Sequence, residues 1–310
     1  MKNRKPILLT GCTAIGKSKL ANALAEKIPS IIINADALQV YDCWQILSAR
    51  PTAIEMELHE HALYGHVSLL ETYDVGQWLT EVRIVLDEAK QANLRPIIVG
   101  GTGLFLSLLL SGIADIPPIS KSTRLKSNNI RKSTPIQFLN DLKKVDPEVL
   151  TNIDNANIAR LQRAWEVFHE TGKSILTWQK ISLTPVLKIT DVIPIVLYTN
   201  KDILVSSINK RFKKMVSMGV VDEVKKVLSE NDVRFSEVGA FKAIGFQEIC
   251  LFLENKLNAN ELEDAVTIKT RQFAKRQRTW FRNRFGSWNQ LEISKDNKIK
   301  KIIERIDSII

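Results

Sequence analysis

The residues best suited to chemistry form a loop near the start of the chain. The loop reads Gly11, Cys12, Thr13, Ala14, Ile15, Gly16, Lys17 and Ser18, which fits the pattern G-x-x-x-x-G-K-[ST]. Its glycines let the backbone approach a di- or triphosphate closely, and the N–H groups at the start of the next helix face the anion. Lys17 supplies a mobile positive charge, and the Ser18 hydroxyl can bind Mg²⁺. The loop predicts a phosphate or pyrophosphate site but does not identify the reaction.

A carboxylate stands at the end of the next apolar run. Residues 30–36 read Ser-Ile-Ile-Ile-Asn-Ala-Asp, which is typical of a buried parallel strand. The carboxyl ends of such strands face the ligand crevice, so we expect Asp36 to point towards the phosphate loop, with Gln39 following on the same connection. The alternative interpretation is that Asp36 caps the next helix.

A third apolar run, residues 95–99, enters a glycine-rich turn, Gly100-Gly-Thr-Gly103. These glycines permit close approach of the backbone to a ligand, and Thr102 offers a hydroxyl there. The run has no acid at its end, so the carboxylate that holds magnesium in ordinary P-loop ATPases is missing. This argues against a simple ATPase.

Around these residues, apolar runs alternate with helical patterns. The loop lies between the apolar run 6–10 and a helical pattern at 19–27, and a further amphipathic helix is expected over 74–93. After Pro117-Pro118 the composition shifts to a mainly helical stretch, and strand character returns at 192–198. We therefore predict an α/β fold with a parallel-sheet core in residues 1–116 and 191–310, and a helical insertion over 117–190.

Positive charge is concentrated downstream of the loop. The net charge is +10, and residues 201–310 alone carry 22 Lys and Arg against 15 Asp and Glu. In a helix over 261–285, four basic residues fall within about 60° of one another: Arg271, Lys275, Arg278 and Arg282. Leu262, Val266, Phe273 and Trp280 are expected on the opposite, packed side. Such a stripe can follow a phosphate backbone; the alternative is a solvated cationic face.

Composition excludes several other classes of protein. The apolar stretch 104–116 is too short and interrupted to span a bilayer, and the basic N-terminus lacks the apolar core of a signal peptide. The three cysteines are far apart, and the histidines have no metal-ligand spacing. We expect a cytoplasmic protein that does not bind membranes and acts as a monomer.

Together these motifs resemble the tRNA dimethylallyltransferases, also called tRNA isopentenyltransferases. The resemblance runs in order through nearly the whole chain: residues 11–18, 33–36, 39–41, 50–52, 99–104, 146–147, 160–164 and 274–280. It implies a P-loop NTPase-like core, similar to nucleotide kinases, whose insertion grips the tRNA anticodon stem-loop. It further implies transfer of a dimethylallyl group from dimethylallyl diphosphate to N6 of adenosine 37, in tRNAs reading codons that begin with U. Magnesium is the implied cofactor, bound at Ser18.

The resemblance also assigns roles to single residues. Asp36 becomes the general base, Thr102 contacts the substrate near the reacting centre, and Arg211 joins the phosphate loop around the diphosphate. The adenine is expected to leave the anticodon-loop stack and enter a pocket. The residues expected to contact tRNA are Asp36, Ala37, Leu38, Gln39, Thr102, Arg124, Arg160, Leu161, Gln162, Arg163, Ala164, Lys242, Lys275, Arg276 and Gln277.

The sequence departs from the family pattern beside its sites. Cys12 stands where the family usually has Pro, Ile15 and Ala37 where it has Ser, and Arg50 where it has Lys. Glu60-His-Ala-Leu63 replaces Pro-His-His-Leu. Ala37 removes one hydroxyl near the base, and Arg50 keeps the charge while changing its donor geometry. We interpret these changes as drift within the family that could lower activity.

Three alternatives remain at this point. An enzyme that prenylates free adenine nucleotides would share the phosphate loop and Asp36, but the basic helix faces weigh against it. A P-loop nucleotide kinase would also use Asp36, yet no arginine-rich lid is evident. A non-enzymatic RNA-binding protein is disfavoured because Lys17, Ser18 and Asp36 are intact.

Overall fold

The computed structural model describes residues 4–180, 183–230, 239–294 and 299–309, which form two compact units. One unit is Met1–Leu110 with Val186–Ile310, and the other is Ser111–Pro185. The second unit begins and ends five to six residues earlier than the insertion expected from the sequence. The reason is that the carbonyl of Leu109 accepts hydrogen bonds from the N–H groups of Val186 and Leu187, which returns the chain to the first unit.

The first unit is built on a parallel sheet with six strands among the described residues. In spatial order these are β3 (Glu60–Ala62), β2 (Ser30–Asn34), β4 (Arg95–Gly100), β1 (Ile7–Gly11), β5 (Ile193–Tyr198) and β6 (Asn289–Glu292). Every residue of β1, β2 and β4 is buried, as expected for central strands covered on both faces. The predicted α/β, P-loop NTPase-like fold is confirmed.

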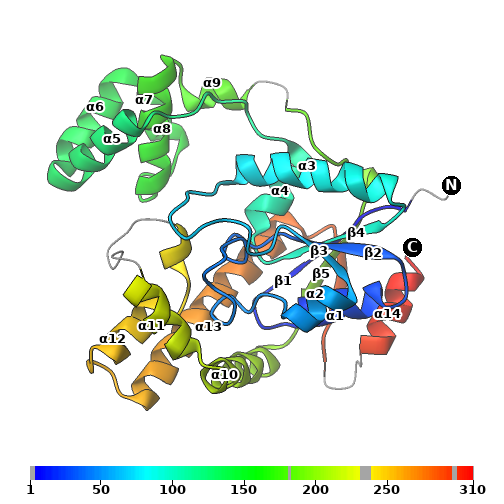
Figure 1. Ribbon diagram of the computed structural model, residues 1–310. Coiled ribbons are helices and arrows are strands. Elements are labelled where there is room, and N and C mark those ends of the chain that lie inside the picture. Colours follow the sequence, from blue (N-terminus) through cyan, green and yellow to red (C-terminus); the bar gives the residue numbers. More distant parts are fainter. Residues whose placement is uncertain (1–3, 181–182, 231–238, 295–298, 310) are drawn as a thin grey trace. The chain divides into compact units, whose positions relative to one another are not determined.

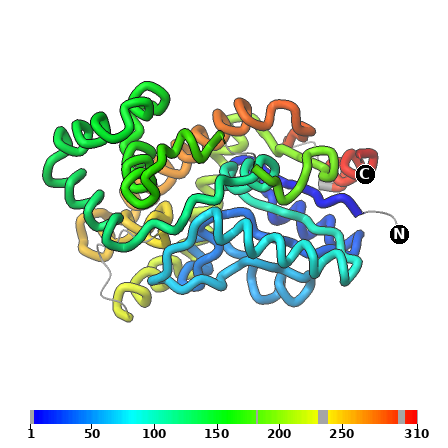
Figure 2. Tube along the Cα trace, turned by 90° about the horizontal axis from the view of Figure 1, so that it is seen from above, coloured from blue at the N-terminus to red at the C-terminus, as the bar shows by residue number. Residues whose placement is uncertain are grey.

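Helices cover both faces of this sheet (Figure 1). On one face, α3 (Val75–Gln91), α4 (Gly103–Ser111) and the end of α13 (Ala259–Arg284) share a core with β2 and β4. On the other face, α1 (Lys17–Ala25) packs beside α14 (Ile299–Asp307), although the two are far apart in the sequence. Figure 2 shows the same unit along its Cα trace, with α14 in red. The short helix α2 (Ala53–Leu58) precedes β3, and the 3₁₀ helix η1 (Ile189–Asp191) precedes β5.

A third hydrophobic cluster holds the helices that follow β5. It joins α10 (Lys201–Ser217), α11 (Val220–Glu230), the 3₁₀ helix η2 (Gly239–Lys242), α12 (Phe246–Leu253) and the start of α13. Trp44 is its buried centre; the indole N–H donates to the carbonyl of Ala240, and the ring lies against Phe246. Because Trp44 belongs to the connection after β2, this cluster fixes that connection against the helices.

The second unit is helical and has its own core. It contains α5 (Lys121–Ser133), α6 (Pro135–Val145), α7 (Pro147–Asn152), α8 (Ile158–Thr171) and α9 (Ile175–Gln179). Trp165 is fully buried there beside Phe138, and its indole N–H donates to the carboxylate of Asp141. Pro135 and Pro147 each occupy the first helical turn, where a missing N–H costs nothing.

Helix α13 forms where the sequence predicts it, but its packed face is rotated. Leu262 and Val266 are buried as expected, whereas Phe273 and Trp280 are only half-buried. The buried positions in the second half are Ala274, Gln277 and Phe281. The four residues of the basic stripe are exposed, as predicted. Within the described ranges, no helix is both long and apolar enough to cross a membrane.

Candidate active site

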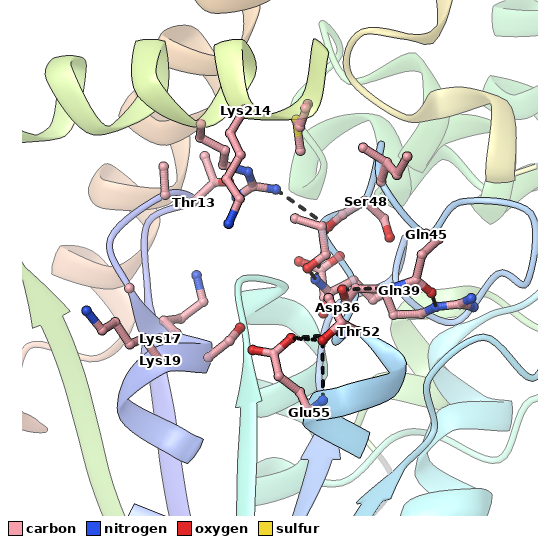
Figure 3. Close-up of a pocket in the computed structure, with 18 of the residues that line it drawn as sticks. Thr13, Lys17, Lys19, Asp36, Gln39, Gln45, Ser48, Thr52, Glu55 and Lys214 are labelled. Carbon is pink, nitrogen blue, oxygen red and sulfur yellow. Dashed lines mark hydrogen bonds between the residues drawn. The ribbon is translucent and has the colours of Figure 1, made fainter. Parts of the chain in front are cut away.

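A cavity of about 810 Å³ opens where β1, β2 and β4 end, within the first unit. Its wall carries more positive than negative side chains. The cations are Lys17, Lys19, Arg50, Arg211 and Lys214, against the carboxylates of Asp36 and Glu55. Figure 3 shows Lys17 and Lys19 entering from the phosphate-loop side, Asp36 and Gln39 from the opposite side, and Lys214 from α10. The cavity is therefore suited to a polyanionic ligand with a carboxylate placed beside it.

The phosphate loop presents its helix N-terminus to this cavity. Gly16 is the N-cap of α1 with φ 98°, a left-handed conformation that favours glycine, and no side chain caps the helix. The first N–H groups of α1 and the positive end of its dipole are thus left for an anion. The ammonium of Lys17 donates to the carbonyls of Gly11 and Cys12 at 3.0 and 2.9 Å. Burial lowers the pKa of Lys17 to about 8, while the charge of Asp36 opposes that shift.

Arg211, which the family resemblance places near the diphosphate, reaches the phosphate loop from α10. One guanidinium nitrogen donates to the Thr13 hydroxyl at 3.0 Å, and the other lies 3.5 Å from the carbonyl of Ser48. Burial lowers its pKa from the usual value, although Asp36 acts in the opposite direction. One turn further on, Lys214 adds a second cation to the same wall.

Asp36 is held by its own backbone connection. Its N–H donates to the Asn34 side chain at 2.8 Å, and its Oδ1 accepts the N–H of Leu38 at 3.0 Å. The other cavity carboxylate, Glu55, is already engaged: one oxygen accepts from the Asn22 amide and the other from the backbone and hydroxyl of Thr52. Asp36 is consequently the carboxylate better placed to take a proton from a substrate.

Side chains from three parts of the site converge beside Gly101. A Cβ on this glycine would lie 3.6 Å from Asp36 Oδ2, 3.7 Å from Lys17 Nζ and 2.5 Å from the Gln277 amide nitrogen. No side chain larger than hydrogen fits without displacing Gln277. Thr102, the next residue, accepts the N–H of Ala37 on its hydroxyl at 3.0 Å and donates its own N–H to Ala35. Thr102 therefore holds the Asp36 connection; its contact with substrate stays a prediction.

Comparison with known proteins agrees with this geometry. The family model "IPP transferase" matches residues 39–284. The chain belongs to this family. The tRNA dimethylallyltransferase of Cereibacter sphaeroides is 40% identical over 289 residues, covering 93% of this chain and 89% of that protein. That of a Ruegeria species is 40% identical over 287 residues, covering 93% and 95%.

Two solved structures of IPP transferase relatives share the fold. A eukaryotic dimethylallyltransferase acting on tRNA superposes with a TM-score of 0.82 at 27% identity, over 99% of this chain and 79% of that one. The full-length tRNA isopentenylpyrophosphate transferase of Bacillus halodurans gives 0.67 at 28% identity, over 98% and 96%.

The residues that depart from the usual IPP transferase pattern leave the site intact. The side chains of Cys12 and Ile15 in the phosphate loop are buried, and burial raises the pKa of the Cys12 thiol. The Arg50 guanidinium donates to the Gln45 side chain and to the carbonyl of Tyr41, and it occupies the space that a side chain at Gly65 would need. Glu60 is exposed at the start of β3. None of these side chains blocks the cavity.

The tRNA-contacting residues expected from the family divide into exposed and buried sets. Arg124 and Arg160 are exposed on the helical unit, and Gln162 and Arg163 are half-buried there. Lys242, Lys275 and Arg276 are exposed on the first unit. Ala37, Leu38 and Gln39 lie half-buried on the Asp36 connection. These placements leave the exposed residues available to RNA, and their contacts stay predictions.

Leu161 and Ala164 need a correction. Both are 0% exposed in the core of the helical unit, so their side chains cannot contact RNA there; they support the helix that carries Arg160.

Gln277 also differs from the expectation. It is 6% exposed, its amide oxygen accepts the N–H of Thr13, and its amide nitrogen donates to the carbonyl of Gly101. Its side chain thus connects the phosphate loop to the turn after β4 through two hydrogen bonds.

Several residues at the site carry no signal in the sequence. Lys214 and Met215 line the cavity from α10, and Met218 lines it from the C-cap of that helix; in the sequence they resemble ordinary residues of a helix surface. Glu223 of α11 accepts three backbone hydrogen bonds from the connection that includes Gln45. Only the fold brings α10 and α11 next to the connection after β2, some 170 positions earlier in the chain.

Proposed function

We propose that this protein transfers the dimethylallyl group of dimethylallyl diphosphate to N6 of adenosine 37 in tRNA. The observation that carries the proposal is the convergence of Lys17, Asp36 and the phosphate loop on one cavity. Membership of a family whose relatives are named tRNA dimethylallyltransferase supports the same reaction. The products are N6-(dimethylallyl)adenosine and diphosphate.

The leaving group is stabilised by the cationic side of the cavity. As the bond between the allylic carbon and the diphosphate oxygen breaks, its electron pair leaves with the diphosphate. Lys17, Arg211 and the N–H groups at the start of α1 surround the place where that negative charge grows. Because these groups are fixed before the reaction, little reorganisation is needed in the transition state.

The nucleophile is a weak exocyclic amine, since its lone pair is delocalised into the adenine ring. As nitrogen N6 forms its bond to the allylic carbon, Asp36 accepts the proton that N6 loses. Its Oδ2 faces Gly101, while Oδ1 is held by the N–H of Leu38. The carboxylate is therefore oriented before the base arrives.

The cavity also has an apolar wall for the hydrocarbon part of the substrate. Ile46, Met215 and Met218 line it together with Val99. A five-carbon chain placed against them loses water, and methionine side chains adapt readily to its shape. Contacts of this kind favour a prenyl diphosphate over inorganic pyrophosphate.

Magnesium fits this site as an ion held mainly by the substrate. Among the described residues, no group of three His, Cys, Asp or Glu side chains could hold a metal by itself. The Ser18 hydroxyl lines the cavity, and Mg²⁺ commonly binds through one or two protein ligands plus phosphate oxygens. When bound, the ion would neutralise charge on the departing diphosphate.

A labelled-prenyl transfer assay tests the proposed function. The protein is incubated with labelled dimethylallyl diphosphate, Mg²⁺ and either a tRNA containing A36-A37-A38 or AMP. We expect label in the tRNA and none in AMP. Label in AMP alone would contradict the proposal and indicate an enzyme that acts on free nucleotides.

A further inference from the structure

We propose that Glu223 is a positioning residue that fixes the cavity wall for both substrates, a role that rests on the proposed function. Glu223 lies in the first turn of α11. Its Oε1 accepts the N–H groups of Gln45 and Ile46, and its Oε2 accepts that of Leu47, each at 2.8 Å. One carboxylate thus binds three consecutive backbone donors, an arrangement that needs its charge and its several lone pairs.

The backbone that Glu223 holds carries contacts to both sides of the cavity. The carbonyls of Ser48 and Ala49 accept the amide of Gln39 at 3.0 and 2.9 Å. The Ser48 carbonyl also faces the guanidinium of Arg211 at 3.5 Å. Gln39 belongs to the connection that carries Asp36, and Arg211 belongs to the diphosphate side. A shift of this backbone would therefore move groups on both sides.

Within the same segment, the side chains of Gln45 and Arg50 are hydrogen-bonded to each other. The Gln45 side chain accepts from Arg50 at 2.8 Å and donates to the carbonyls of Arg50 and Pro51. Gln45, Ile46 and Arg50 all line the cavity. Glu223 thereby links the cavity wall that follows β2 to helix α11, which lies outside the cavity lining.

Loss of Glu223 should act locally, because other contacts keep the segment attached. The Trp44 indole N–H donates to Ala240, and the Ser48 hydroxyl donates to the carbonyl of Trp44 at 2.6 Å. The fold of this region is held by the hydrophobic cluster around Trp44. The role of Glu223 is thus to set the exact course of residues 45–47 rather than to hold the protein together.

The test compares Glu223→Ala and Glu223→Gln with a control, Glu230→Gln, on the same helix. Glu230 is exposed, and within the described residues it makes one exposed ion pair, with Lys226. Titration calorimetry gives the Kd for dimethylallyl diphosphate and for inorganic pyrophosphate. Steady-state transfer assays give kcat and KM. Hydrogen exchange gives the exchange rates of the backbone amides of residues 45–47.

For Glu223→Ala we expect Kd and KM for dimethylallyl diphosphate to rise roughly tenfold, with faster exchange of the three amides. Glu223→Gln keeps an oxygen for two of the donors, so its values should fall between wild type and Glu223→Ala. Glu230→Gln should match wild type, whereas the KM for tRNA should also rise in Glu223→Ala, because the shifted backbone holds Gln39.

The proposal is overturned if Glu223→Ala folds and binds dimethylallyl diphosphate within about twofold of wild type. If Glu223→Ala does not fold, Glu223→Gln decides: wild-type Kd and KM together with faster exchange at Leu47 would contradict a positioning role. Failure of the proposed function can be distinguished from failure of this proposal. If the proposed function is wrong, wild type transfers no label, but the Kd values for pyrophosphate still show whether Glu223 positions the cavity wall.

Discussion

At the scale of single residues, two side chains of opposite charge, Lys17 and Asp36, lie on either side of a small space in the site. Lys17 and Asp36 each lie within 4 Å of the place where a Gly101 side chain would be. Lys17 carries the charge that a diphosphate needs, and Asp36 carries the acceptor that the amine needs. Removing either charge should affect a different step.

Asp36→Asn should reduce kcat by about 10²–10⁴, because the amide cannot accept the N6 proton. The amide oxygen can still accept the Leu38 N–H that shapes the connection. The affinity for tRNA, measured by filter binding, should therefore remain close to that of wild type. Equal losses of kcat and of tRNA affinity would point to damage of the connection rather than loss of a base.

Lys17 should give the reaction a descending limb at alkaline pH. Burial lowers its pKa from 10.5 to about 8 in the free protein, so kcat/KM for dimethylallyl diphosphate should fall as the pH rises through about 8. Lys17→Arg, whose charge does not titrate there, should lack this limb. A limb that persists in Lys17→Arg would assign it to another group.

The same shift predicts the opposite trend for stability. Between pH 8 and 10.5 the folded protein binds fewer protons at Lys17 than the unfolded chain, so this group makes folding more favourable as the pH rises. Thermal unfolding measured across that pH range separates the two effects. As the pH rises, activity should fall, whereas the contribution of Lys17 to Tm should increase.

At the scale of elements, α13 serves two surfaces at once. Its outer side bears the exposed basic stripe, and its inner side carries Gln277 to the phosphate loop and the turn after β4. We predict that the stripe follows the phosphate backbone of the tRNA. Gln277 instead satisfies two backbone groups that would otherwise be buried without partners.

Gln277→Ala should weaken dimethylallyl diphosphate binding by roughly tenfold, since the Thr13 N–H and the Gly101 carbonyl would lose their shared partner. Gln272→Ala, on the exposed side of the same helix, is the matched control and should bind the diphosphate like wild type. The measurement is calorimetric titration. Equal Kd values for dimethylallyl diphosphate in the two variants would show that the hydrogen bonds of Gln277 do not hold the phosphate loop in its binding conformation.

At the scale of the whole molecule, the local motifs and the strands β1, β2, β4 and β5 could be predicted from the sequence, whereas β3, β6 and the spatial order of the strands were not. The phosphate loop, the Asp36 strand and the helical stretch each have a short-range pattern of apolar and polar residues. The direction of Gln277 could not be predicted, because α13 packs on different clusters along its length. Leu262 and Val266 belong to one, Ala274 to a second and Phe281 to a third, so a single helical wheel gives the wrong phase.

The position of Glu223 shows a second limit of sequence reasoning. Its partners lie 176–178 residues earlier in the chain, and nothing near Glu223 distinguishes it from other acids in a first helical turn. The burial of Leu161 and Ala164 was readable from their apolar spacing, and it excludes the RNA contact that family resemblance suggested for their side chains. Resemblance locates a segment, whereas packing decides which side chains of it face a partner.

The most direct test of the central claim is mass spectrometry of nuclease fragments from a tRNA treated with the protein, dimethylallyl diphosphate and Mg²⁺. We predict one added dimethylallyl group on the fragment that contains A37, located on the base, and none when position 37 is changed to G. Modification at another adenosine, or of the tRNA with G37, would contradict transfer to N6 of adenosine 37.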